Sequence, residues 1–165
     1  MFTRRAAQGI AECEHALKVD RNLAQAHSTI GRGKILVGRA EETEAHIAEA
    51  LRLSLRDTWA YVWMSHVGMA KNHLGLWEQA AAWFRRAIEA NRNYPTPYFL
   101  SAAALAQLGR PDEARSAVKA GLALNPAFSI SRVGAAWTAM SDNATYLAQL
   151  EPVFEGMRKA GVPEH

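Results

Sequence analysis

Cysteine is almost absent from this sequence, and so are long apolar runs. Among its 165 residues Cys13 is the only cysteine, which excludes an intramolecular disulfide and a Cys-x-x-Cys metal or redox site and favours a cytoplasmic location. The uncharged stretch at residues 93–109 contains two prolines and is shorter than a membrane span. Arg4 and Arg5 precede no apolar run, so we expect neither a signal peptide nor a membrane partner.

An excess of charge of one sign is also missing. The formal net charge is +3, and the first 60 residues hold nine Lys or Arg against eight Asp or Glu. A stripe that binds nucleic acid is expected to be less balanced. Charges of both signs on helices usually form a solvated face, so we expect no nucleic-acid partner.

The sequence has no arrangement of residues that supports catalysis. Residues 31–34, Gly-Arg-Gly-Lys, lack the glycine spacing and the following Ser or Thr of a phosphate-binding loop. His66 and His73 are seven residues apart without the further ligands that zinc needs, and are better explained as partly exposed histidines of a groove. Cys13 and His15 are too close on one helix to face each other as nucleophile and base. We therefore expect a protein that is not an enzyme and has no metal and no cofactor.

What the sequence does have is a small residue that recurs at a nearly fixed step. Three series share one register, each with one step of 37 residues and the others of 34. They are Ala16, Ala50, Ala87 and Gly121; Gly31, Gly68, Ala102 and Ala136; and Thr43, Ala80, Ala114 and Ala148. Small residues let two helices pack about 8–10 Å apart, and repetition at this period is typical of helical solenoids.

Apolar residues at intervals of three and four predict helices over nearly the whole chain, with glycine stops between them. We predict one domain over residues 1–165 that contains about nine helices. Its units are an orphan second helix at 3–22, full helix pairs at 24–57, 61–94 and 95–128, and a terminal pair with a cap at 129–160. The fold class that follows is all-α, a right-handed superhelix of stacked antiparallel helix pairs with a concave surface.

Two segments carry a family resemblance. Leu-Gly-Leu-Trp-Glu-Gln-Ala at 74–80 and Leu-Gly-Arg-Pro-Asp-Glu-Ala at 108–114 resemble the tetratricopeptide repeat (TPR). The likeness extends over residues 3–160 and is weaker in the first full pair, where Thr43 replaces the usual alanine. The resemblance implies that the first helix of each pair lines the concave side of the superhelix.

A narrower resemblance involves residues 51–57, 102–115 and the ending Gly-Met-Arg-Lys-Ala-Gly-Val-Pro-Glu at 156–164. These segments look like the C-terminal repeat region of bacterial proteins in which TPRs follow a class III adenylate/guanylate cyclase domain or another signalling domain. The resemblance implies the regulatory or interaction part of such a protein. It does not imply cyclase activity, because the metal-binding carboxylates and the nucleotide pocket have no counterpart here.

Projecting the first helices onto the concave side predicts a groove that binds a protein or peptide partner. The face is apolar and aromatic with a few polar groups, which suits an amphipathic helix or an extended peptide. The predicted residues are Arg32, Ser65, Met69, Asn72, His73, Phe99, Gln107, Val133 and Trp137. The alternative, which the sequence leaves open, is that Phe99 and Trp137 pack against a C-terminal helix folded into the groove.

The second hypothesis is self-association. The chain opens on a second helix whose own first helix is missing, so Ile10, Cys13 and Leu17 are expected to have an uncovered apolar flank. A terminal repeat normally carries a polar cap. This predicts a homodimer or a swapped arrangement through residues 3–19. At the other end Glu155 stands where a small residue is expected, which predicts that the last helix is a cap.

Overall fold

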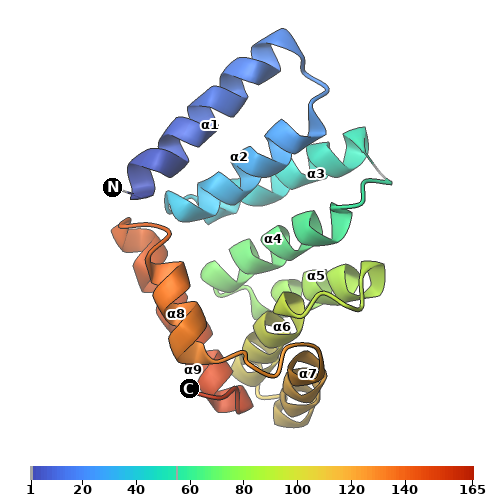
Figure 1. The fold of residues 1–165 in the computed structure, drawn as a ribbon, viewed down its shortest axis with the longest axis vertical. Helices are drawn as coiled ribbons and strands as arrows, with labels where there is room; N and C mark the ends of the chain where they lie inside the picture. Colours follow the sequence, from blue (N-terminus) through green and yellow to red (C-terminus); the bar gives the residue numbers. More distant parts are fainter. Residues whose placement is uncertain (1, 55) are drawn as a thin grey trace.

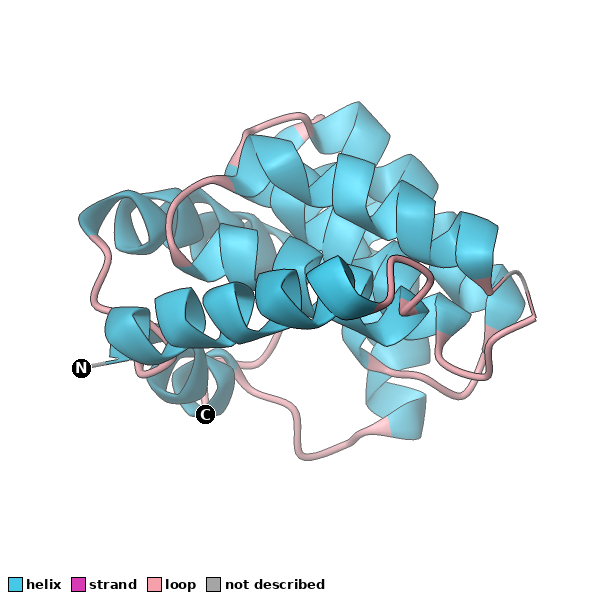
Figure 2. Ribbon diagram, turned by 90° about the horizontal axis from the view of Figure 1, so that it is seen from above, coloured by secondary structure: helices cyan, strands magenta, loops and turns pink. Residues whose placement is uncertain are grey.

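The computed structural model describes residues 2–54 and 56–165, and every regular element in these residues is a helix (Figure 2). The nine predicted α-helices and the all-α class are confirmed for this part of the chain. Leu55, in one of the segments compared above, lies outside it. No helix in the described ranges is both long enough and apolar enough to cross a bilayer. The helices are α1 (Phe2–Val19), α2 (Ala24–Leu36), α3 (Thr43–Leu53), α4 (Ala60–His73), α5 (Trp77–Ala90), α6 (Thr96–Gln107), α7 (Pro111–Leu124), α8 (Ile130–Thr138) and α9 (Ala144–Ala160), with a short 3₁₀ helix η1 (Ala40–Glu42).

Helices α2 to α7 form three antiparallel pairs that stack one below the other in Figure 1, with α1 against the first pair. Each first helix packs on its second helix, and α4 also contacts both α2 and α6. The helices α2, α4 and α6 therefore form an inner layer, and α1, α3, α5 and α7 form an outer layer. We call α2 to α7 the stack.

Glycine ends the first helix of each pair, as the sequence predicts. Gly38, Gly75 and Gly109 have φ angles of 75°, 69° and 71°, the left-handed conformation that glycine adopts without strain. In each case the next residue donates its N–H to a carbonyl five residues earlier, for example Arg110 to Leu105 at 2.9 Å. This satisfies a carbonyl at the helix end that would otherwise lack a partner.

The small residues of the repeat make close helix contacts inside the stack. A Cβ atom added to Gly68 would lie 2.5 Å from the ring of Phe84 on α5, and one added to Gly121 would lie 2.8 Å from the ring of Phe99 on α6. Thr43 departs from the usual alanine, but its buried hydroxyl donates to the carbonyl of Gly31 at 2.9 Å. The departure therefore adds a hydrogen bond between α2 and α3.

Residues 129–160 form a helix pair, but the pair does not extend the stack. Ala136 and Ala148, which continue two of the small-residue series, are exposed. Instead α9 packs on α6 and, less extensively, on α4 and α7, while α8 packs mainly on α9. In Figure 1 α8 runs along one side of the stack, back toward its N-terminal end. We call α8 and α9 the hairpin.

The predicted apolar flank of α1 is covered by its own chain. Ile10 is only 9% exposed and packs against Gly33 of α2. Cys13 and Leu17 are half-buried, and burial raises the pKa of the Cys13 thiol. The expectation that Ile10 is uncovered is therefore wrong, because Ile10 faces α2. A homodimer stays a prediction.

Candidate functional site

The hairpin fills the part of the concave surface that lies over α6. The backbones of α9 and α6 touch, since a Cβ atom on Gly156 would lie 2.6 Å from the carbonyl oxygen of Ala103. Both ends of the Gln107 side-chain amide form hydrogen bonds with α9: Nε2 donates to the carbonyl of Pro152 at 2.7 Å, and Oε1 accepts from Lys159 at 3.1 Å. The C-terminal helix α9 therefore folds into the groove, as in the alternative that the sequence leaves open, and Trp137, though not Phe99, stacks on it.

The turn between α8 and α9 docks at the C-terminal end of α2. The Ser141 hydroxyl donates to the carbonyl of Leu36 at 2.5 Å. Asn143 caps α9, with its Oδ1 accepting the N–H of Tyr146 at 3.0 Å, and the same Oδ1 lies against Gly38. The hairpin thus bridges the first and last pairs of the stack along one edge.

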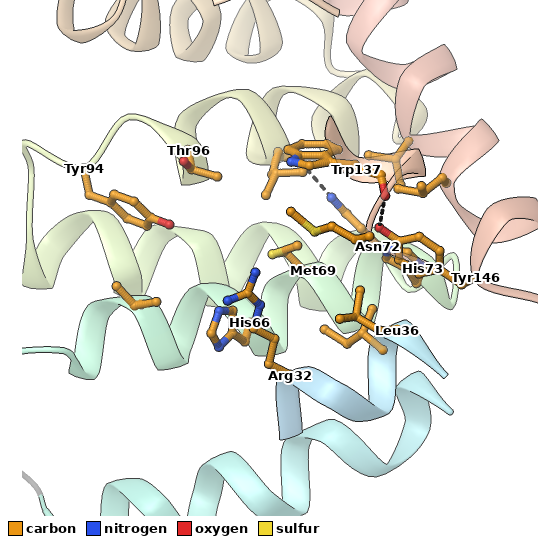
Figure 3. Close-up of a pocket in the computed structure, with 16 residues that line it drawn as sticks. Arg32, Leu36, His66, Met69, Asn72, His73, Tyr94, Thr96, Trp137 and Tyr146 are labelled. Carbon is orange, nitrogen blue, oxygen red and sulfur yellow. Dashed lines mark hydrogen bonds between the residues drawn. The ribbon is translucent and has the colours of Figure 1, made fainter. Parts of the chain in front are cut away.

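Between this edge and the inner layer lies a cavity of about 230 Å³ (Figure 3). In the close-up Arg32 and His66 lie side by side, Tyr94 and Thr96 lie toward one end, and Tyr146 lies at the other. Polar residues that line the cavity include Arg32, His66, Asn72, His73, Thr96 and Tyr146. Apolar lining residues include Leu36, Met69, Leu100, Trp137 and Val153. The cavity therefore combines apolar walls with a few placed polar groups, as ligand and peptide sites do.

A second hollow continues the cavity along α2 and α4, and the two share Arg32, Val62 and His66. It extends toward the N-terminal ends of these helices, where Trp59 is 58% exposed and lines it. We call the two hollows together the α2–α4 groove. This groove is the part of the concave surface that the hairpin leaves open.

The end wall of the cavity is held by the hairpin. His73 of α4 stacks on Tyr146 of α9, with 5.2 Å between the ring centres. The Tyr146 hydroxyl donates to the carbonyl of Trp137 at 2.9 Å, and the Trp137 ring stacks on Phe154 at 5.9 Å. These contacts fix the aromatic wall in one position.

Asn72 is buried beneath the cavity, and only one end of its side-chain amide is hydrogen-bonded. Its Nδ2 donates to the carbonyl of Leu100 at 3.1 Å, which ties α4 to α6. Its Oδ1 is buried and accepts no hydrogen bond. A buried acceptor without a donor costs free energy, so this atom gains from any donor that enters the cavity.

Three ionisable rings around the cavity, those of His66, His73 and Tyr146, are neutral near pH 7. Burial and, secondarily, the positive charge of Arg32 lower the pKa of His66 to about 4. Burial also lowers the pKa of His73 to about 4. Burial raises the pKa of Tyr146 to about 12. Arg32 is therefore the fixed charge among the residues that line the cavity.

The structure brings five of the nine predicted groove residues into this cavity: Arg32, Met69, Asn72, His73 and Trp137. Phe99 does not belong to the concave surface, because it is fully buried and stacks on Phe128 with 3.6 Å between ring centres. Ser65 is also buried, at 1% exposure. Gln107 is bound by α9, and Val133 lies on α8, packed against the core. For these four residues the helix-face projection was wrong. It placed an open groove at Gln107, where α9 lies, and it did not anticipate the burial of Phe99 and Ser65 in the helix packing.

His66, Tyr94, Thr96 and Tyr146 complete the cavity, and the projection missed them. His66 had a signal in the sequence, because it lies three and seven residues before Met69 and His73 on the same helix. His66 is half-buried beside Arg32, in line with the expected partly exposed histidine, whereas His73 is only 7% exposed and departs from that expectation. Tyr146 had none, because its place depends on how the hairpin folds back.

Comparison with known proteins supports the fold. Residues 95–128 match the model of the tetratricopeptide repeat family. These residues are α6 and α7 with their flanking turns. One unit of the chain is therefore similar to a tetratricopeptide repeat.

Solved structures with the same arrangement of helices include MamA and YrrB. The crystal structure of MamA superimposes with a TM-score of 0.66 at 19% identity, over 91% of this chain and 87% of that one. YrrB, a TPR protein with an unusual peptide-binding site, superimposes with a TM-score of 0.61 at 22% identity, over 93% of this chain and 78% of that one. At these identities the likeness concerns the fold. No curated protein sequence matches the chain.

Proposed function

We propose that this protein is a non-catalytic interaction scaffold that binds a peptide or helix of a partner protein in the α2–α4 groove. The observation that carries the proposal is the open groove itself: two adjoining hollows with apolar walls, a neutral polar floor and one exposed guanidinium. The cavity alone, at about 230 Å³, is smaller than pockets for whole small molecules, which usually have about 300–1,000 Å³. The second hollow extends it along α2 and α4, which suits an elongated peptide. The TPR fold supports a role in binding protein segments, and YrrB is a TPR solenoid with a peptide-binding site.

The test is selection of short peptides from a random library on the purified chain, followed by affinity measurements on two variants. Met69→Arg places a long charged side chain in the cavity, and we expect it to weaken the selected peptides at least tenfold, about 1.4 kcal/mol. Gln79→Arg adds the same side chain to an exposed position on α5 and serves as the control. Peptides that bind both variants as tightly as the wild type would show that the groove is not the binding site.

We also propose that the scaffold works in the cytoplasm as part of a bacterial signalling protein. The support is the resemblance of residues 156–164 to the ends of such proteins, together with the single thiol. The upstream reading frame tests this: a cyclase or other signalling domain fused to or encoded beside the chain is expected, and a neighbourhood without one would count against it.

A further inference from the structure

Arg32 occupies the centre of the open concave surface. Its side chain lines the cavity, the second hollow and a third hollow between α1, α2 and α8. Arginines on other faces, such as Arg39, Arg52 and Arg110, pair with neighbouring carboxylates. Arg32 is exposed and forms no hydrogen bond or ion pair with any described residue. Its guanidinium is therefore available to a ligand.

The surroundings of Arg32 carry no compensating negative charge. Among the described residues that line the three hollows there is no Asp and no Glu. The acidic side chains of the stack that form ion pairs, such as Glu42, Glu49 and Glu113, lie on η1, α3 and α7. The concave surface is therefore positive next to an outer layer that carries carboxylates, and a partner with negative charge is complementary to it.

The position of Arg32 also indicates where in a bound segment the negative charge lies. Because Arg32 lies where the cavity meets the second hollow, a segment in the groove has chain on both sides of the guanidinium. A carboxylate at that point is then a side chain within the segment and not a chain end. Guanidinium binds carboxylate with two parallel hydrogen bonds, which gives geometric as well as electrostatic preference.

A second, independent observation concerns Asn72. This side chain is 1% exposed, and its Oδ1 lacks a donor at the floor of the cavity. A peptide that enters the cavity brings N–H groups, whereas a purely apolar ligand brings none. The cavity thus selects a ligand that supplies both an apolar group and a donor.

We propose that the partner of the α2–α4 groove is an acidic peptide segment. An internal Asp or Glu pairs with Arg32, a neighbouring apolar side chain fills the cavity over Met69, and an N–H of the segment donates to Oδ1 of Asn72. This inference rests on the proposed function, and it adds the chemistry of the partner to it.

The probes are three pools of short synthetic peptides, acetylated and amidated so that side chains carry the only charges. The pools share Leu, Phe, Ser and Ala and differ in one further residue, which is Glu, Gln or Lys. By fluorescence polarisation we expect the Glu pool to bind at least tenfold more tightly than the Gln pool at low salt, with a smaller advantage at high salt. Arg32→Gln removes that advantage, and Arg32→Glu transfers it to the Lys pool. Arg85→Gln removes a charge from an exposed position on α5 and leaves the order of the pools unchanged.

Two other outcomes separate this inference from the proposed function. If the Glu and Gln pools bind equally and Met69→Arg abolishes both, the groove binds peptides but its partner is not acidic. If no pool binds the wild type, or Met69→Arg changes nothing, the groove is not a peptide site and both proposals fail. Because Arg32 is exposed, its variants keep the fold, and thermal unfolding checks this.

Discussion

The stack and the hairpin carry the same spacing of small residues and use it differently. In the stack Ala80, Ala87 and Ala114 are fully buried, and Gly68 receives the ring of Phe84. In the hairpin the corresponding alanines face solvent, and the close contact is made by Gly156 against α6.

A repeat period therefore predicts helices and their lengths more securely than it predicts which neighbour each helix packs on. Packing of a further pair requires an apolar surface on the last second helix and a first helix that matches it. The chain instead offers a long C-terminal helix with a glycine that fits the backbone of α6. The hairpin consequently closes one side of the concave surface and gives the cavity its aromatic end wall.

The largest expected effect tests the stack. Phe84→Ala removes a fully buried ring that fills the space beside Gly68, and we expect it to lower the free energy of unfolding by about 3–5 kcal/mol. The measurement is urea denaturation followed by circular dichroism. Trp59→Ala removes an aromatic side chain that is 58% exposed, and is expected to cost much less. Equal losses from the two variants would mean that the repeat packing does not dominate stability.

The sequence predicted the stack well because its information is local. Glycine stops, apolar periodicity and small residues at a fixed step each act within one pair of helices, and Gly38, Gly75 and Gly109 end their helices as expected. The groove was predicted only in part. Arg32, Met69, Asn72 and His73 lie on first helices and were found by projecting one face of each helix.

The rest of the site was not predicted from the sequence, for reasons that are clear at Phe99, Gln107 and Tyr146. Phe99 packs against Gly121 of α7 and stacks on Phe128, so it faces the interior of its own helix pair and not the groove. Gln107 binds a carbonyl 45 residues away along the chain, and Tyr146 stacks on His73 across a longer gap in sequence. Such contacts depend on where the hairpin folds back, and no periodicity within a helix encodes that.

The second-largest expected effect is a pH dependence of folding stability, which involves one histidine on the open side of the cavity and one on the closed side. His66 lies on the open side and His73 stacks on the hairpin, and burial lowers the pKa of each to about 4. Between that value and the unfolded pKa of about 6.5, the unfolded chain binds more protons than the folded one. Stability is therefore full above pH 6.5 and falls as the pH drops, by roughly 2 kcal/mol for each histidine between about pH 7.5 and pH 5.

Urea midpoints measured at both pH values check this prediction. His73→Gln and His66→Gln are each expected to remove about half of the pH-dependent loss. His15→Gln, at an exposed position on α1, is the control and should keep the whole loss. A pH dependence that survives the double replacement of His66 and His73 would have to come from other groups.

The smallest expected effect separates the hairpin from the stack. Gly156→Val places a side chain where a Cβ atom already lies 2.6 Å from the carbonyl of Ala103. Because the obstacle is backbone, α9 must move away from α6, at an expected cost of about 1–3 kcal/mol. Hydrogen exchange should show loss of protection in α8 and α9, while α3, α4 and α5 stay protected.

Gly134→Ala on α8 is the matched control for that experiment. A Cβ atom at position 134 would meet the ring of Phe154 at 3.7 Å, an ordinary contact, and alanine stabilises a helix relative to glycine by about 1 kcal/mol. We expect this variant to retain or raise protection in α8. Loss of protection throughout the stack in Gly156→Val would show that the hairpin and the stack fold as one cooperative unit, in which case the cavity cannot open by release of the hairpin alone.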